Sequence, residues 1–134
     1  IIRSAAGFGA DAVLLPKHRQ APITGTVAKS SAGTFTMIPI VEIGNVQSTL
    51  KKLQKDGFWS MALDGEGEPL TNFVFDRSVV LVVGNEGEGI GQKVKEKADF
   101  VISIPLKEGV ESLNASVAAG VVIYEWNRQN LGGK

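Results

Sequence analysis

Polar side chains follow two strongly apolar runs of this chain, at positions where they could bind a ligand and do chemistry. The first group follows the run over 100–104 and comprises Glu111, Ser112 and Asn114. The second follows the run over 79–83 and begins the glycine-rich segment 84–91. Backbone N–H groups are exposed where a loop enters a helix, and the carboxyl ends of parallel strands meet at one edge of a sheet. The spacing therefore predicts one pocket built from both segments.

The glycine-rich segment fits neither of the common phosphate-binding loops. The dinucleotide-binding pattern needs a glycine where this chain has Gln92, and the P-loop needs Lys and then Ser or Thr directly after Gly91. The carboxylates of Glu86 and Glu88 would also repel a polyphosphate. A cofactor without phosphate, such as S-adenosylmethionine, suits these residues better, because backbone amides and apolar side chains can hold its adenine. A plain strand-to-helix turn, with glycines for positive φ, is the alternative.

The composition narrows the possible chemistry. The 134-residue chain has no cysteine and one histidine, so a thiolate nucleophile is excluded and we expect no metal site. The formal net charge is +0, whereas a domain that grips RNA by itself usually has a basic excess. RNA affinity from a local patch, a second subunit or an appended domain stays open. No apolar run is long enough to span a membrane, so we expect no membrane partner. The absence of cysteine fits a cytoplasmic protein.

Apolar runs alternate with helical patterns along the chain. Continuous apolar runs are typical of parallel strands covered on both faces, and helices between them complete a doubly wound α/β domain. The predicted strands cover 12–15, 35–41, 58–63, 79–83 and 100–104. The predicted helices cover 24–31, 46–55, 90–98 and 113–126. We also expect Asn45 to cap the helix over 46–55 and residues 64–69 to form a loop.

The chain begins abruptly. Residues 1–6 have helical character, yet no capping residue precedes them. We therefore expect residues 1–134 to form one domain from which the first strand is missing.

Three segments resemble the motifs of one enzyme family, the SpoU-type RNA ribose 2′-O-methyltransferases of the SPOUT superfamily. Gly84-Asn85-Glu86-Gly87 looks like motif 2 of that family. Ile104-Pro105 together with Ser112-Leu113-Asn114 looks like motif 3. Residues 2–11 resemble the second half of motif 1, whose usual Asn-x-Gly start would precede this chain. The motifs occur in the family's order, and the resemblance spans almost the whole chain.

The resemblance implies a fold and an activity. The fold would be a parallel-sheet, doubly wound SPOUT domain with a C-terminal trefoil knot. The activity would be transfer of a methyl group from S-adenosylmethionine to a ribose 2′-hydroxyl of RNA. The 111–114 version of motif 3 looks most like bacterial enzymes that methylate a guanosine of large-subunit rRNA. The alternatives are a tRNA guanosine enzyme of the same family and a non-catalytic RNA-binding module with the same fold.

The resemblance also implies partners for the domain. The RNA substrate would be rRNA rather than tRNA, and an appended RNA-binding domain in the full-length protein is an open expectation. The domain would be a homodimer to which the C-terminal helix contributes. Four apolar side chains of this helix could serve the interface, although core packing explains them equally well: Val117, Val121, Tyr124 and Trp126.

The family's cofactor-binding positions match six residues of this chain. They are Gly84, Asn85, Gly87, Ile104, Leu106 and Leu113. Backbone groups would make much of the contact with S-adenosylmethionine, so plain core packing is an equally natural role for the side chains of Ile104 and Leu113.

Four residues match positions that would carry the chemistry: Arg3, Glu86, Ser112 and Asn114. A guanidinium is effectively always charged, so we expect Arg3 to hold the target phosphate and stabilise the developing alkoxide rather than act as a base. Glu86 is then the most suitable group to accept the hydroxyl proton. Ser112 and Asn114 would orient the ribose or the cofactor's carboxylate. The simpler alternatives are a solvated arginine, and N-capping of the 113–126 helix by Ser112 or Asn114.

Overall fold

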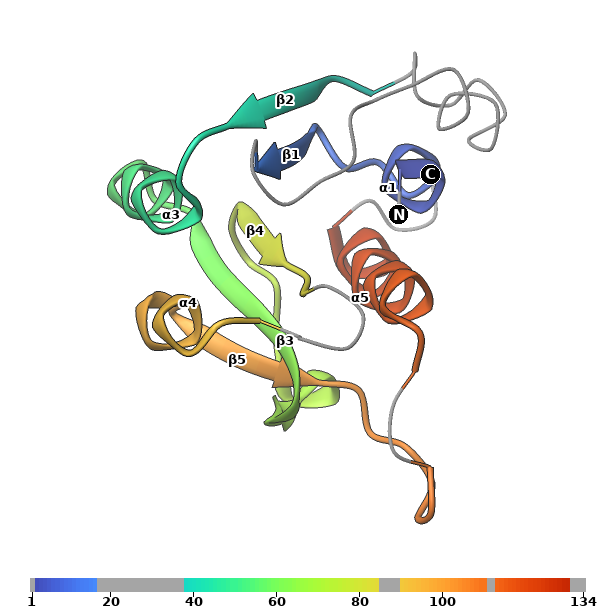
Figure 1. Cartoon of the computed structure of the whole chain (residues 1–134). Helices are drawn as coiled ribbons and strands as arrows, with labels where there is room; N and C mark the ends of the chain where they lie inside the picture. The colour runs from blue at the N-terminus through green and yellow to red at the C-terminus, as the bar shows by residue number, and fades with distance from the viewer. Residues whose placement is uncertain (1, 17–37, 85–89, 111–112, 131–134) are drawn as a thin grey trace.

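The computed structural model describes residues 2–16, 38–84, 90–110 and 113–130 (Figure 1). These residues form four α-helices, one 3-10 helix and five strands. In chain order the elements are α1 (Ile2–Gly7), β1 (Val13–Pro16), β2 (Ile40–Ile43), α3 (Val46–Lys55), β3 (Trp59–Pro69), η2 (Leu70–Asn72), β4 (Val79–Val82), α4 (Gln92–Lys97), β5 (Phe100–Ser103) and α5 (Ala115–Asn130). None of the described helices is both long and apolar enough to cross a lipid bilayer.

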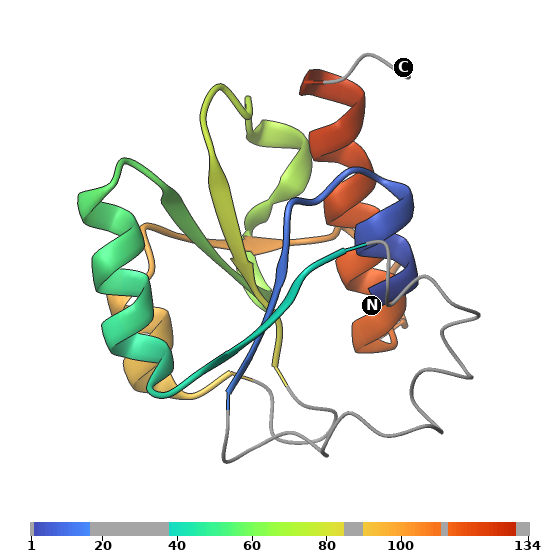
Figure 2. The same cartoon turned by 90° about the horizontal axis from the view of Figure 1, so that it is seen from above.

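The strand pairs between described residues are parallel. β1 pairs with β2, and β3 lies between β4 and β5. Figures 1 and 2 show α3 and α4 on one side of these strands, with α1 and α5 on the other. Helices on both sides explain why β4 consists of apolar residues throughout. The predicted α/β class with parallel strands is therefore confirmed.

The core lies between the central strand β3 and helix α5. Its buried members are Met61, Leu70, Phe75, Ile102 and Val122. Aromatic rings pack edge to face beside it, with the centroid of Phe100 5.0 Å from Trp59 and 5.3 Å from Phe73. Such aromatic pairs contribute on the order of 0.5–1.5 kcal/mol beyond their buried area. Residues from β3, β5, α5 and the segment after β3 are thereby joined in one cluster.

A buried hydrogen-bond network joins α3, β3 and the residue before β5. The Ser60 side chain is fully buried, and its Oγ donates to Asp99 Oδ2 at 3.2 Å. The same Oγ accepts from Gln54 Nε2 at 2.8 Å and from the Asp99 backbone N–H at 2.9 Å. The Ser60 backbone N–H donates to Asp99 Oδ2 at 2.8 Å. Since a serine hydroxyl offers one donor and two acceptor positions, the network uses all of them.

Most of the predicted elements occur, with changes at their ends. α3 has the predicted bounds, and Asn45 Oδ1 accepts from the Ser48 backbone N–H at 3.0 Å, which confirms the predicted N-cap. The strand predicted over 35–41 is described as β2, which ends two residues later. The C-terminal helix ends at Asn130, four residues beyond its predicted end. The helix predicted over 24–31 lies outside the described residues.

The prediction of a loop over 64–69 is wrong, because β3 continues through this segment. Its register against β5 shifts here, so the extension is irregular. Gly67 lies against the backbone of β5, where a Cβ atom would be 2.6 Å from the carbonyl carbon of Val101. Ser103 Oγ also donates to the Gly67 carbonyl at 2.8 Å. A segment with the composition of a turn is thus held as a strand by contacts with a distant part of the chain.

The close approach at Gly67 predicts a large effect of a single methyl group. Gly67→Ala should lower the free energy of unfolding by about 1–3 kcal/mol, because the clash is with backbone atoms of β5 that cannot rotate away. Gly65→Ala is the matched control, since a Cβ atom there meets nothing within 4 Å, and it should change stability by less than about 0.5 kcal/mol. Urea unfolding measures both. Equal stability of the two variants would contradict the packing described for Gly67.

Candidate functional site

The two segments expected to form the site leave the β4-β3-β5 sheet at the same edge. Val82 of β4 and Val101 of β5 both pair with Ala62 of β3, so the outer strands are level at this point. Gly84 follows Val82 by two residues, and Ile104 follows Val101 by three. Because the strands are parallel, the chain leaves β4 and β5 in the same direction. The predicted meeting of the two strand ends at one edge is confirmed, with β3 between them.

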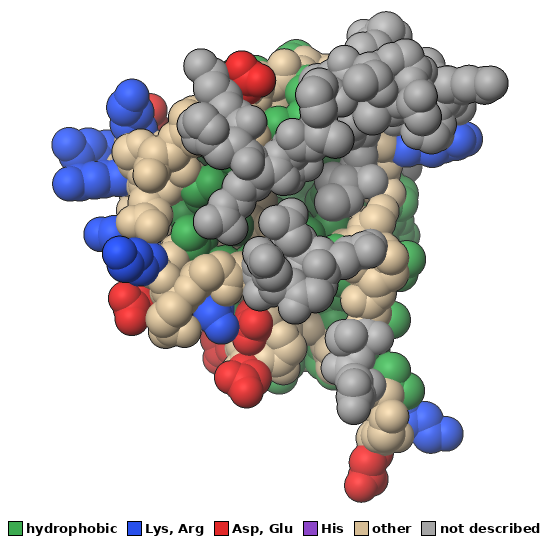
Figure 3. All heavy atoms as spheres, viewed as in Figure 1, with side chains coloured by type: hydrophobic (Ala, Val, Ile, Leu, Met, Phe, Trp, Pro, Cys, Tyr) green, Lys and Arg blue, Asp and Glu red, His purple; other side chains and the backbone are tan. Residues whose placement is uncertain are grey.

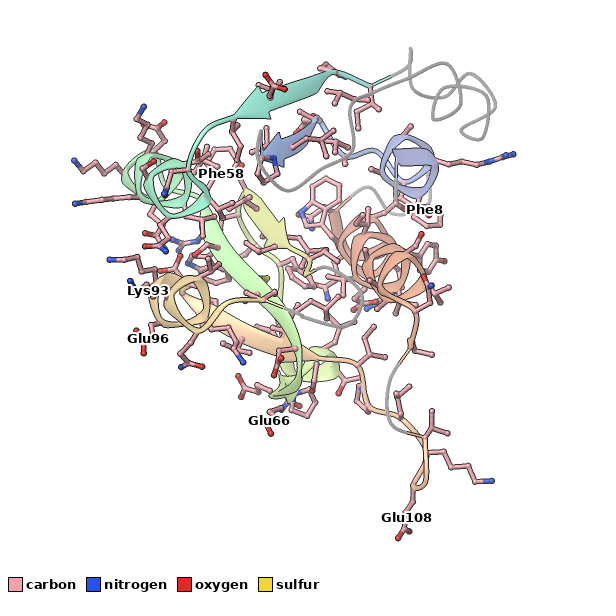
Figure 4. All side chains as sticks on the ribbon, viewed as in Figure 1. Phe8, Phe58, Glu66, Lys93, Glu96 and Glu108 are labelled. Carbon is pink, nitrogen blue, oxygen red and sulfur yellow. The ribbon has the colours of Figure 1, made fainter. Side chains whose placement is uncertain are left out.

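The segment after β5 projects from the body of the domain. Figure 4 shows Glu108 near its tip. Gly109 has a φ of +93°, and the Val110 backbone N–H donates to the Lys107 carbonyl at 3.1 Å, which closes a turn. Leu106 is 37% exposed and Val110 is 50% exposed. Leu106, one of the predicted cofactor contacts, therefore presents apolar surface that a bound molecule could cover.

Ile104 and Leu113, two further predicted cofactor contacts, are half-buried. Ile104 packs against the core cluster, so its side chain has the core-packing role that was the alternative for it. A backbone contact with a ligand is compatible with that role, because it would use the main chain and not the side chain. Gly84, at the end of the other strand, is also half-buried.

Asn114 caps the N-terminus of α5. Its Oδ1 accepts from the Ser116 backbone N–H at 2.8 Å and from that of Val117 at 3.4 Å. The Asn114 carbonyl accepts the first intrahelical bond, from the Ala118 N–H at 2.9 Å. The capping role considered for Asn114 is thus confirmed. It places the side chain where the loop after β5 enters the helix.

Several of the predicted site residues lie outside the described residues. They are Asn85, Glu86, Gly87 and Ser112, together with the neighbouring Glu111. The roles given to these residues stay predictions. The described part of the site consists of the strand ends, the projecting loop and the start of α5.

Helix α1 is fastened to α5 by small residues and one hydrogen bond. Gly120 faces Ser4 so closely that a Cβ atom on Gly120 would be 3.3 Å from Ser4 Oγ. Asn127 Nδ2 donates to the Phe8 carbonyl at 2.8 Å, and the Phe8 ring meets Tyr124 edge to face, 5.3 Å between centroids (Figure 4). These contacts fall on the middle and the C-terminal half of α5. They set the position of α1 relative to the helix that carries Asn114.

Arg3 lies on α1 with its side chain exposed. Ala5, two residues later, is 3% exposed, so the first turns of α1 have one buried and one solvent-facing side. The exposed guanidinium can reach a phosphate without breaking any packing. The role given to Arg3 stays a prediction. The contacts of α1 with α5 lie beyond the first turn of α5.

The C-terminal end of α5 is anchored by a carboxylate and an amide. Arg128 donates to Glu125 through Nε at 2.7 Å and Nη2 at 2.9 Å. These bonds lower the pKa of Glu125. A hydrogen bond from Gln129 Nε2 also lowers this pKa, whereas burial of the carboxyl group raises it. Gln129 also accepts from the Phe75 backbone N–H at 2.7 Å and donates to the Phe73 carbonyl at 3.1 Å. The network ties α5 to the segment that follows β3.

A surface pocket beside α4 was not predicted from the sequence. The pocket is open, has a volume of about 300 Å³ and is lined by Asp64, Glu66, Gln92, Lys95, Glu96 and Val101. Lys95 Nζ lies 3.6 Å from Asp64 Oδ1, which leaves an excess of carboxylates. Among the described residues, none of those predicted for the site lines it. The pocket was missed because it depends on the strand extension through 64–69, which was expected to be a loop.

Comparisons with known proteins give consistent matches. The family model described as "SpoU rRNA Methylase family" matches residues 1–124. The 23S rRNA (guanosine-2'-O-)-methyltransferase RlmB of Xanthomonas campestris is 43% identical over 132 residues, which cover 98% of this chain and 53% of that protein. The chain spans about half the length of the curated relatives it matches.

Solved structures give the same result. The SpoU methyltransferase AviRb from Streptomyces viridochromogenes, in complex with AdoMet, has a TM-score of 0.88 at 27% identity, covering 99% of this chain and 55% of that one. The TrmH/SpoU tRNA modifying enzyme of A. aeolicus has a TM-score of 0.84 at 27% identity, covering 98% of this chain and 68% of that one.

The lowered pKa of Glu125 predicts how the anchoring of α5 depends on pH. The folded-state pKa lies below the unfolded value of about 4.3, so the network stabilises the fold above that pH and loses its effect as the pH falls through the folded pKa. Glu125→Gln should lower Tm by roughly 1–4 °C at pH 7 and by progressively less below about pH 4. Calorimetry at several pH values measures the difference. Glu108→Gln on the projecting loop is the control, and a Glu125→Gln deficit that persists unchanged at pH 3 would contradict the assignment.

Proposed function

The chain belongs to the SpoU rRNA Methylase family, and we propose that it transfers a methyl group from S-adenosylmethionine to a ribose 2′-hydroxyl of RNA. The observation that carries the proposal is the family match over residues 1–124, a range that includes every residue predicted for the site. The related structure solved with AdoMet supports the choice of cofactor. Because the chain spans about half of its curated relatives, the activity of the whole protein is part of the proposal.

The proposed substrate is a guanosine of large-subunit rRNA. The name of the Xanthomonas relative, a 23S rRNA (guanosine-2'-O-)-methyltransferase, supports this choice, and so does the form of motif 3 in the chain. The related A. aeolicus tRNA modifying enzyme supports tRNA as the alternative. The two RNAs carry the same reacting group, so the chemistry of the site is the same for both.

The described residues fit a cofactor of this type. The level ends of β4 and β5 bring Gly84 and Ile104 to one edge, where backbone groups can bind an adenine edge, and Leu106 offers exposed apolar surface. With Leu113 at the start of α5, and with Asn85 and Gly87, these residues would hold S-adenosylmethionine. When bound, the cofactor supplies a methyl group on a positively charged sulfur. An approach of the hydroxyl in line with that bond is what the protein must arrange.

The protein's part is to orient the ribose and stabilise charge on its oxygen. The positive charge of the Arg3 guanidinium would hold a neighbouring phosphate and stabilise the developing alkoxide. Glu86 would accept the hydroxyl proton, since a carboxylate can take a proton at neutral pH and a guanidinium cannot. Ser112 and Asn114 would orient the ribose or the cofactor's carboxylate. The cap formed by Asn114 Oδ1 places this side chain where the loop after β5 enters α5.

The proposal extends to assembly and topology. Val117, Val121 and Tyr124 are 55%, 38% and 51% exposed and lie along one side of α5, which supports a homodimer formed through this helix. Trp126 packs against the core instead. The proposal includes a C-terminal trefoil knot, which is supported by membership of the family. We also propose a further RNA-binding segment in the full-length protein. The curated relatives, which are about twice as long as this chain, support it.

A methyl-transfer assay tests the proposed function. The chain is incubated with radiolabelled S-adenosylmethionine and unmodified bacterial rRNA or tRNA. We expect label in one ribose of one RNA, and Arg3→Ala should lower the rate by roughly 10²–10³-fold because a charge-stabilising group is lost. Cofactor affinity by calorimetry and the Tm should change little, since Arg3 is exposed. Full methyl-transfer activity of Arg3→Ala would show that Arg3 has no catalytic role. Cofactor binding without label in any RNA would favour a non-catalytic module.

Asn114→Asp separates the capping role from the role in the site. An aspartate caps a helix as well as an asparagine, so Tm should stay within about 2 °C of the wild type. The substitution removes the amide donor and adds a negative charge, so methyl transfer should fall by at least about tenfold. Asn114→Ala is the companion variant and should lose both stability and activity. Wild-type activity of Asn114→Asp would show that the residue acts only as a cap.

A further inference from the structure

Positive charge is concentrated on the two helices that lie on the opposite side of the strands from Arg3. α3 has three lysines and no acidic residue in ten residues, and α4 has three lysines and one glutamate in six. The two helices therefore carry a net charge of +5. The formal charge of the whole chain is +0, so everything outside these helices carries −5. The neutral composition hides a strongly asymmetric distribution.

Packing turns these lysines into one surface. α3 and α4 lie side by side (Figures 1 and 2), and Gln54 Nε2 of α3 donates to the Lys97 carbonyl of α4 at 2.8 Å. Lys95 is drawn into an ion pair with Asp64. The other five lysines are exposed, and we call them the lysine face: Lys51, Lys52, Lys55, Lys93 and Lys97. Figure 3 shows Lys and Arg side chains gathered over α3 and α4, and Figure 4 shows Lys93 on the outer side of α4.

The charges of the lysine face are not neutralised within the described part of the chain. The ion pairs between described residues involve Arg77, Lys95 and Arg128, and none involves a member of the lysine face. Asp99, two residues after Lys97, accepts hydrogen bonds from Ser60 through its Oδ2. Asp56, directly after Lys55, and Glu96 are exposed acids beside the five exposed lysines, so the face keeps a positive excess.

Helix stability does not explain this arrangement. Lysines in the last turn of a helix interact favourably with its dipole, which accounts for Lys52, Lys55 and Lys97. Lys93, however, is the second residue of α4, where a positive charge is unfavourable. Lys51 with Lys55, and Lys93 with Lys97, are like charges four residues apart, and such pairs destabilise a helix. The face therefore carries a cost that a polyanion would relieve.

We propose that the lysine face is a second RNA-binding surface, which contacts the phosphodiester backbone away from the methylated nucleotide. This inference rests on the proposed function, because RNA is the polyanion that the enzyme would meet. Lysines bind phosphates as point charges, so this surface adds affinity and orientation without reading sequence. It lies beyond the sheet from α1, so a folded RNA that spans the domain would contact both sides.

Direct RNA binding, measured without cofactor, tests the surface. The probe is a fluorescein-labelled RNA hairpin with a stem of about 16 base pairs, followed by anisotropy over a range of salt concentrations. Replacing all five lysines with Gln should weaken binding by at least about tenfold near 0.1 M salt. It should also reduce the slope of log K against log salt by about 2–4, since each lost phosphate contact removes about 0.7–0.9. The five-fold Lys→Arg variant keeps the charge and should bind within about threefold of the wild type.

The controls separate this inference from other outcomes. Arg77→Gln, which removes one exposed positive charge outside both the face and the proposed site, should leave affinity and salt slope unchanged. Unchanged binding by the five-fold Gln variant, or an equal loss in the Arg variant, would overturn the proposal. Lysine-dependent binding to phosphatidylserine vesicles without binding to RNA would also overturn it and identify a membrane surface instead. If RNA binds through the lysine face but the methyl-transfer assay labels no RNA, only the proposed function fails. If RNA is methylated but its binding does not depend on the five lysines, only the inference about the lysine face fails.

Discussion

The register of β5 against β3 is the constraint on which the rest of the structure depends, and the buried Ser60 network sets it. Every hydrogen-bonding position of the Ser60 hydroxyl is used, twice with Asp99 and once with Gln54. Asp99 is the last residue before β5, so these bonds fix where that strand starts beside β3. A buried polar group that loses its partner costs about 1–3 kcal/mol, which penalises any other alignment.

The position of the proposed site follows from this alignment. With Val101 opposite Ala62, Ile102 is fully buried in the core and Ile104 lies at the sheet edge. A shift of one residue would turn Ile102 toward the other face and would move the loop after β5 with it. Ser103 and Gly67 add a second point of attachment further along β3. Core packing and site geometry are therefore set by the same few bonds, and neither can change alone.

The sequence was most informative where structure is decided locally. α3 was predicted with its correct bounds because Asn45 caps it and Gly57, with a φ of +93°, ends it. The segment 64–69 was predicted wrongly because its glycines and acidic residues are typical of a turn. What makes it a strand is the approach of Gly67 to β5, some 35 residues away, which no local pattern contains. Likewise, Asn114 was identified as a cap or a ligand-orienting group, and the described geometry establishes the first role.

The charge of the chain shows why composition alone is a poor guide to RNA binding. A net charge of +0 argued against a domain that binds RNA tightly by itself. Net charge, however, averages over surfaces of the protein that one ligand does not contact at the same time. At physiological salt the field of a surface charge is screened over about 8 Å, less than the thickness of a helix laid on a sheet. A phosphate beside α3 and α4 therefore experiences mainly the charges of those helices and of their immediate neighbours, among them Asp56, Asp64 and Glu66. The negative charge farther away has little effect on it. The lysines lie in two stretches of sequence about 40 residues apart, and only the packing of α3 against α4 makes them one surface.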